Sequence, residues 1–85
     1  MESVTLDKLS NGEYLRVVGI NSDKFPRRLM ELGISENAKI KKLFSPPWGE
    51  PSAYSVKGAV MALRSEDAKM IYGIKGTESE DLGRY

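Results

Sequence analysis

The sequence predicts a mainly β domain of about five short strands, with one short helix inserted after the first strand. Two observations predict this fold class. Short runs of β-forming residues alternate with turn signals along most of the chain, which is typical of small all-β domains. A helical spacing of apolar residues that spans more than one turn occurs between the first two of these runs. The length of 85 residues leaves room for one small domain with a thin core.

The first strand is expected over residues 13–20. Asn11 and Gly12 precede it, and both tolerate the positive φ angles of a tight turn. Apolar residues in this run fall on both faces, which indicates a central strand or a bulge near Val17 and Val18. Residues 5–10 have the composition of a turn, and no strand is expected there.

The helix is expected directly after this strand. Phe25, Leu29 and Leu32 fall at positions i, i+4 and i+7, which places them on one helical stripe that we expect to be core. Pro26 suits a first helical turn, and Gly33 is the expected stop after the last turn. A helix this short is not stable alone and must pack against the sheet.

The remaining strands are expected over residues 38–44, 53–57, 60–64 and 70–74. Asn37 is a candidate for the left-handed conformation in the turn before the first of them. Three prolines indicate that residues 46–51 form a loop, since proline cannot donate a backbone hydrogen bond to the ladder of a central strand. Gly58 and Ala59 are the expected turn of a hairpin, and residues 65–68 form a single capped turn. Residues 1–74 are therefore the predicted domain, and residues 75–85 a flexible polar tail.

Short strands in a domain this small favour a closed sheet, because closure removes exposed edges that the chain is too short to cover. We therefore expect an SH3-like β-barrel. An OB-like barrel is the alternative.

The composition indicates a binding or regulatory module, and we expect no enzyme. The chain has no His and no Cys. This removes the commonest physiological acid/base, thiol nucleophiles, thiolate zinc sites and Fe–S clusters. Ser and Thr nucleophiles lack a His partner, and no phosphate-binding loop motif occurs. We expect no catalytic residues, no cofactor and no metal ligands.

Net charge and hydropathy limit the partners and the cellular location that we expect for the protein. Thirteen basic and twelve acidic residues give a net charge of +1, which does not indicate a nucleic-acid binder. No apolar run approaches the length of a membrane span or resembles a signal peptide. We expect a cytoplasmic protein with no nucleic-acid partner and no direct membrane insertion.

An ordered set of short motifs resembles the FeoA family. The set runs from about Leu6 to Ile74 and so covers most of the chain. One departure is Glu36-Asn37, where the family often has a Pro-Gly turn. The motifs are Arg27-Arg28-Leu29, Leu32-Gly33-Ile34, Gly49-Glu50-Pro51, Val56-Lys57-Gly58 and Ala62-Leu63-Arg64, with Gly12, Ala68 and Ile71 around them.

The resemblance implies a small cytoplasmic SH3-like accessory protein of ferrous iron uptake. Its implied partner is FeoB, the membrane permease with a cytoplasmic GTPase domain, which it would bind and either regulate or assemble. A similar domain ends the iron-dependent repressors of the DtxR type. We do not expect a repressor, because 85 residues leave no room for a helix-turn-helix part.

Four residues are candidates for partner binding, and we expect a single partner contact that combines the helix and the 46–51 loop on which they lie. Lys24, Arg27 and Arg28 form a basic group around the helix, which could speed encounter with an acidic partner or could be ordinary solvated charge. Trp48 lies among the prolines of the 46–51 loop. It is either folded back as a lid on the core or exposed as an anchor of the kind enriched at binding hot spots.

Two other functions remain as alternatives. A weak transition-metal-binding carrier would depend on carboxylates, which cluster only at residues 66–67 and 78–81. A small-barrel nucleic-acid-binding module would reveal itself by strongly salt-dependent binding. An exposed apolar loop could also form a homodimer.

Overall fold

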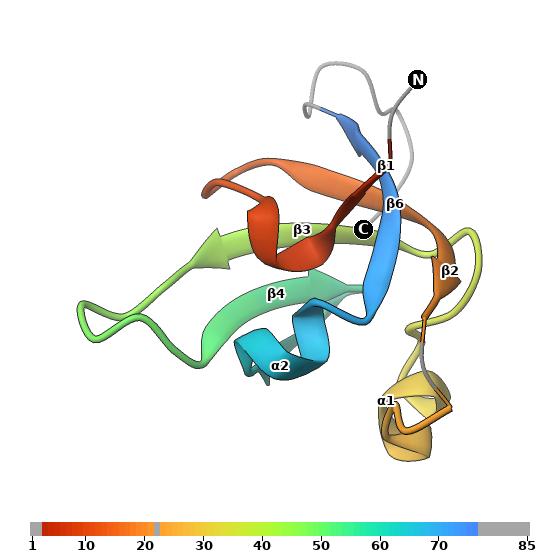
Figure 1. Ribbon diagram of the computed structural model, residues 1–85. Helices are drawn as coiled ribbons and strands as arrows, with labels where there is room; N and C mark the ends of the chain where they lie inside the picture. Colours follow the sequence, from red (N-terminus) through yellow and green to blue (C-terminus); the bar gives the residue numbers. More distant parts are fainter. Residues whose placement is uncertain (1–2, 22, 77–85) are drawn as a thin grey trace.

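The computed structural model describes residues 3–21 and 23–76. These residues form one curved antiparallel sheet with short helical segments at its ends (Figure 1). The mainly β fold class is thereby confirmed. In chain order the elements are β1 (Ser3–Thr5), η1 (Leu6–Lys8), β2 (Tyr14–Ile20), α1 (Arg27–Glu31), β3 (Lys39–Phe44), β4 (Ser52–Val56), β5 (Ala59–Leu63), α2 (Ser65–Ala68) and β6 (Ile71–Gly76).

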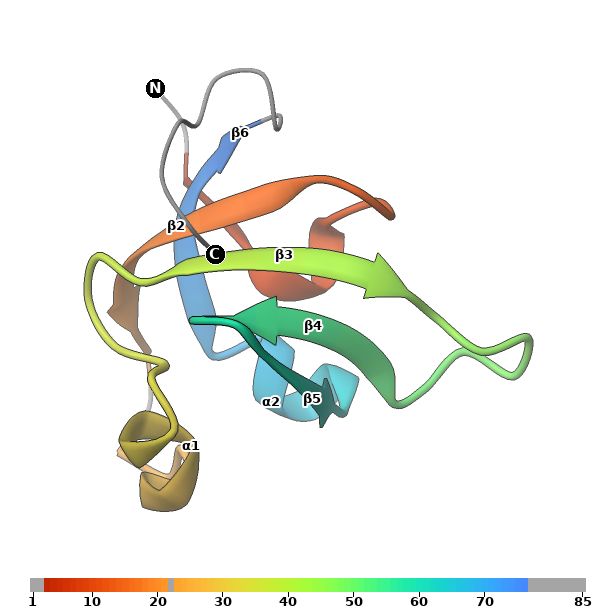
Figure 2. The same ribbon diagram turned by 180° about the vertical axis from the view of Figure 1, so that it is seen from behind.

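The sheet has six strands in the order β1-β6-β2-β3-β4-β5, one more than expected. Strands β2 to β5 follow one another as a meander, and β6 returns to lie between β1 and β2 (Figure 2). The additional strand is β1, which ends at Thr5, where the segment of turn-like composition begins. It is three residues long and pairs with β6 from the other end of the domain, with Val4 opposite Gly73. A strand defined by such a distant partner leaves little signal in its own sequence.

The bulge expected near Val17 and Val18 is confirmed. The register between β2 and β6 shifts between Val17 and Gly19. Val17 is fully buried, whereas Val18 turns outward and is 42% exposed. The extra residue bends β2 toward the point where the chain leaves for α1.

Two expected turn conformations are confirmed by backbone angles. Asn37 has φ of 70°, and Gly33 after the helix has φ of 119°. The hairpin between β4 and β5 turns one residue earlier than expected, at Lys57 and Gly58. Both have positive φ, 52° and 83°, as a two-residue type I′ turn requires.

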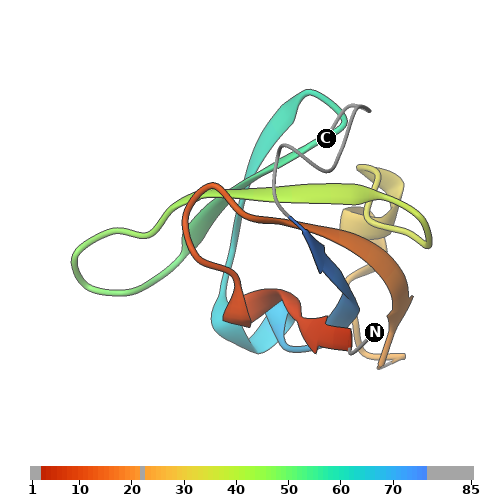
Figure 3. The same cartoon turned by 90° about the horizontal axis from the view of Figure 1, so that it is seen from above.

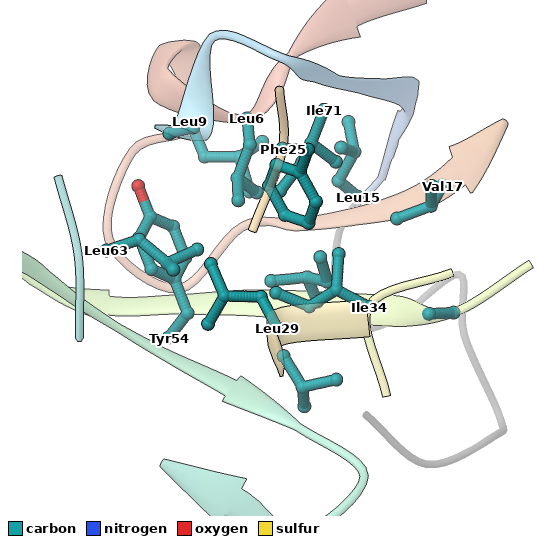
Figure 4. Packing of buried hydrophobic residues seen from close by; sticks show 14 residues of the cluster. Leu6, Leu9, Leu15, Val17, Phe25, Leu29, Ile34, Tyr54, Leu63 and Ile71 are labelled. Atoms are coloured by element: carbon teal, nitrogen blue, oxygen red, sulfur yellow. The ribbon is translucent and has the colours of Figure 1, made fainter. Parts of the chain in front are cut away.

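The core lies inside the curve of the sheet. Phe25, just before α1, and Leu29 within it point into the same cluster as Leu15 and Ile71 of the sheet (Figure 4). The other members come from η1, α2, the strands and the loops: Leu6, Leu9, Val17, Ile34, Ala38, Ile40, Tyr54, Val56, Leu63 and Ala68. Burial of these side chains is the main contribution that stabilises so small a domain.

One expected core residue is not in the core. Leu32 is 54% exposed, so the predicted stripe is wrong at its third position. The helix spans five residues and ends at Glu31, and Gly33 then redirects the chain. Ile34, after this turn, is fully buried in the cluster. A helix of little more than one turn is too short to carry an i, i+4, i+7 stripe.

The last strand extends to Gly76, two residues beyond its predicted end. The remainder of the predicted polar tail, residues 77–85, lies outside the described residues. Across the described ranges, no helix has the length and apolar character that crossing a bilayer demands.

Candidate functional site

The loop between β3 and β4 is braced by hydrogen bonds of its own. The hydroxyl oxygens of Ser45 and Ser52 lie 2.8 Å apart across its base. Nearer the tip, the backbone N–H of Gly49 donates to the carbonyl oxygen of Pro46 at 2.9 Å and closes a tight turn. Pro46 and Pro47 restrict the chain within that turn. Such a loop has less conformational entropy to lose when it binds a partner.

The same loop is tied to α2 and exposes Trp48. The hydroxyl of Ser65 donates a hydrogen bond to Oε2 of Glu50 at 2.8 Å. Trp48 is 76% exposed, so it is not a lid over the core. Of the two positions that the sequence left open for this side chain, the structure shows the exposed one. A large exposed indole on a braced loop has the chemistry of a binding anchor.

The three basic candidates lie around α1. Lys24 precedes the helix, Arg27 and Arg28 form its first turn, and all three are exposed. Leu29 anchors the helix to the core from its other face. A shallow open hollow beside the helix is lined by Ile20, Asn21, Asp23, Phe25, Arg27 and Met30.

The structure does not bring Trp48 and the basic group together. The β3–β4 loop projects from one end of the molecule, and α1 lies at the opposite end (Figures 1, 2 and 3). The whole fold measures 32 × 29 × 25 Å along its principal axes. The loop and α1 are therefore separate surfaces of the fold. They are two candidate sites, where a single combined contact was expected.

An apolar row on the outer side of the sheet was not singled out from the sequence. Phe44 of β3 is directly opposite Ala53 of β4, which is directly opposite Ala62 of β5. Phe44 is 53% exposed, and Val60, two residues before Ala62, is 68% exposed. The signal was present as the uncharged run of residues 59–63. Its exposure depends on where β5 lies in the sheet, which the run itself does not reveal.

Two side chains have shifted pKa values. The backbone N–H of Ser10 donates to Oε1 of Glu13 at 2.7 Å and, with the ammonium of Lys75 at 3.6 Å, lowers the pKa of Glu13 below its ordinary value of 4.5. Burial raises the pKa of Tyr54 above its ordinary value of 10.0. Glu13 and Lys75 link the start of β2 to the end of β6, so this pair serves the sheet.

Acidic side chains do not gather into a metal site within residues 3–21 and 23–76. No group of three or more carboxylates, His or Cys lies close enough together there to hold an ion. Glu66 and Asp67, one of the two predicted carboxylate clusters, form the first turn of α2. The other, residues 78–81, lies outside the described residues.

The FeoA domain family matches residues 4–75 of this chain. No curated protein gives a significant match. Among solved structures, the chain is similar to FeoA of Stenotrophomonas maltophilia complexed with zinc, a prokaryotic SH3 domain protein suggested to act as an activating factor of bacterial ferrous iron transport. The identity is 26% and the TM-score 0.75, over 87% of this chain and 96% of that one.

Two further structures agree with this fold. FeoA from Chlorobium tepidum is 28% identical with a TM-score of 0.75, over 94% of this chain and 75% of that one. The FeoA-like protein from Clostridium acetobutylicum has a TM-score of 0.78 over 100% of this chain and 98% of that one. Its identity of 23% supports the fold alone. The SH3-like architecture expected from the sequence is thus confirmed. The expected closure of the sheet into a barrel is not, because β1 and β5 are the two edges of the described sheet and do not pair with each other.

Proposed function

The chain belongs to the FeoA family of ferrous iron transport, and we propose that it is a small cytoplasmic accessory protein that binds the FeoB-type permease. Binding would regulate the GTPase-bearing permease or assemble it. The observation that carries the proposal is the family match, which spans nearly the whole described sheet. Membership in a family of ferrous iron transport supports a role exerted through contact with a partner of that system.

Two features of the surface support a partner-binding role. Trp48 offers a large apolar contact on a loop that is already ordered by its own hydrogen bonds. Lys24, Arg27 and Arg28 offer positive charge at the other end of the molecule. Exposed charges of this kind steer an acidic partner toward contact but add little affinity.

The proposal predicts distinct kinetic effects at the two ends. Trp48→Ala should weaken binding to the purified permease by about tenfold or more. The effect should be mainly faster dissociation, because a large aromatic contact stabilises the complex once it has formed. Val18→Ala is the matched control: it also truncates an exposed apolar side chain, but on β2, outside the proposed contact surfaces. Biolayer interferometry with the permease in nanodiscs, with and without guanine nucleotide, gives both rate constants.

In the same assay, the double variant Arg27→Glu, Arg28→Glu should mainly slow association, and the effect should shrink at high salt. Circular dichroism must first show that each variant is folded. Wild-type protein that does not bind the permease would refute the proposed function. Folded variants that both bind like wild type would refute the assignment of these two surfaces.

A second candidate function, a weak carrier of transition metals, is favoured by one observation. The similar Stenotrophomonas maltophilia protein has been solved with zinc. The present chain would have to bind such an ion through oxygen ligands, since it contains neither His nor Cys.

A further inference from the structure

Strand β5 forms one edge of the sheet, and no other described strand pairs with its outward side. Among the described strands, β5 pairs with β4 alone. After a two-residue turn, the residues that bond to β4 are Ala59, Met61 and Leu63, which alternate with the outward-facing ones. The backbone N–H and C=O groups of Val60 and Ala62 therefore point away from β4. Neither residue has a hydrogen bond to another described residue on that side.

This edge lacks the features that usually keep sheet edges from pairing. Natural edge strands are short, or carry charges, prolines or bulges. The opposite edge strand, β1, is three residues long. In contrast, β5 has five uncharged residues without proline, and its register with β4 is continuous. Val60 and Ala62 are exposed. The edge is therefore available to another strand.

Part of the outer side of the sheet next to this edge is apolar. Phe44, Ala53 and Ala62 form a row across three adjacent strands, and Val60 lies beside the row on β5. A strand added to β5 would place every second side chain next to this row, because side chains alternate along a strand. Apolar side chains at those positions would bury the exposed surfaces of Val60 and Ala62.

Charge indicates the chemistry of the added strand. Residues 39–64, from the start of β3 to the end of β5, contain five basic residues and a single acidic one, Glu50. Glu50 already accepts a hydrogen bond from Ser65. Lys57 and Arg64, both exposed, lie at the two ends of β5. An acidic segment complements this surface.

The same charges disfavour a second copy of this chain as the occupant. Antiparallel pairing of β5 with itself would bring the Lys57 end of one copy to the Arg64 end of the other, at both ends of the ladder. Like charges facing each other across strands are destabilising.

We propose that β5 receives an extended acidic segment of the permease as an added strand of the sheet, with acidic residues facing Lys57 and Arg64. This inference rests on the proposed function, that the protein acts by binding the permease. Backbone hydrogen bonds to Val60 and Ala62 would supply affinity, and the row of Phe44, Ala53 and Ala62 would select the side chains, as in other cases of β-strand addition.

The first test uses Ala62→Pro. Proline at an outward-facing edge position removes one N–H from the free edge and none from the β4–β5 ladder. We expect it to weaken binding to the nanodisc-embedded permease by about tenfold, because a ladder bond is lost and the ring obstructs the added strand. Ala62→Val, which keeps the N–H and favours the strand, should bind about as well as wild type. Circular dichroism must show native structure in both variants.

A second test does not depend on how well the proline variant folds. In hydrogen exchange measured by NMR, the amides of Val60 and Ala62 should exchange rapidly in the free protein and be protected in the complex. Val60→Glu should weaken binding more than Val60→Lys, since only the former repels an acidic segment. Stronger weakening by Val60→Lys would overturn the acidic chemistry of the segment.

Further outcomes separate this inference from the function on which it rests. If wild type and Ala62→Pro bind the permease equally and the two amides stay unprotected, the edge proposal is wrong while the proposed function stands. If wild type does not bind at all, the proposed function fails. A dimer of the free protein that Ala62→Pro dissociates, or oligonucleotide binding that Ala62→Pro abolishes, would assign the edge to a different occupant and overturn the proposal.

Discussion

Gly73 lies where β6 crosses β2 with no room for a side chain. It pairs with Val4 on one side and Val17 on the other, next to the bulge of β2. A Cβ atom added here would overlap the carbonyl oxygen of Arg16 and lie 2.9 Å from Cα of Val17. Both are backbone atoms of a central strand and cannot move alone. The approach of the two strands therefore depends on glycine at this position.

Gly73→Ala should destabilise the domain by about 1–3 kcal/mol or more, as overpacking of a core does. Urea unfolding followed by circular dichroism measures the loss. Gly19→Ala is the matched control in the partner strand. Its added Cβ would lie 2.5 Å from the hydroxyl oxygen of Tyr72, the far end of a side chain that can shift. A loss at Gly73 no larger than that at Gly19 would show that the β2–β6 contact is looser than described.

At the scale of elements, α1 has a sharp boundary between core and surface. Leu29 is 7% exposed and Leu32, three residues later, is 54% exposed. Leu29→Ala should cost about 2–5 kcal/mol, since it leaves a cavity in the core. Leu32→Ala should change stability by about 0.5 kcal/mol or less. Thermal and urea unfolding of both variants measures the contrast, and equal losses would contradict a boundary between Leu29 and Leu32.

The sequence alone predicts those elements whose residues have a local preference for the conformation that they adopt. The β-forming run of β2, its bulge, the left-handed Asn37 and the proline-rich loop all follow from local preferences. Strand β1 could not be predicted in this way, because three residues form a strand only when β6 lies beside them. The exposure of Leu32 depends on a helix that ends earlier than its apolar spacing suggests.

For the candidate site, the sequence supplied the residues and the fold supplied their arrangement. A tryptophan among prolines is visible in the sequence, but its exposure depends on the loop that holds it. The separation of Trp48 from Arg27 and Arg28 follows from the course of β3, which runs from the α1 end of the sheet to the loop end (Figure 2). The free edge of β5 depends on strand order.

On the scale of the whole molecule, charge is unevenly distributed although the net charge is only +1. The β3–β5 meander is basic, and the remainder of the chain is acidic overall. A protein of this kind can approach an acidic partner in a preferred orientation, with association that is sensitive to salt. The candidate contacts at α1 and at Trp48 lie at opposite ends of the fold, so their variants should act independently on binding.

The last prediction concerns iron itself and follows from the chemistry of the whole chain. Ferrous iron is held most often by imidazole together with carboxylate, and this sequence has no imidazole and no thiolate. The described residues bring no three carboxylates together. We therefore expect anaerobic calorimetry to detect no stoichiometric Fe²⁺ complex with a Kd below about 1 µM. Zn²⁺, the ion found with the Stenotrophomonas maltophilia protein, is the second probe. A tighter stoichiometric complex with Fe²⁺ would contradict this prediction, and removal of residues 77–85 would then show whether the acidic tail supplies the ligands. Binding that survives the deletion would place the metal on the sheet and favour the carrier function over a role exerted through contact with the permease alone.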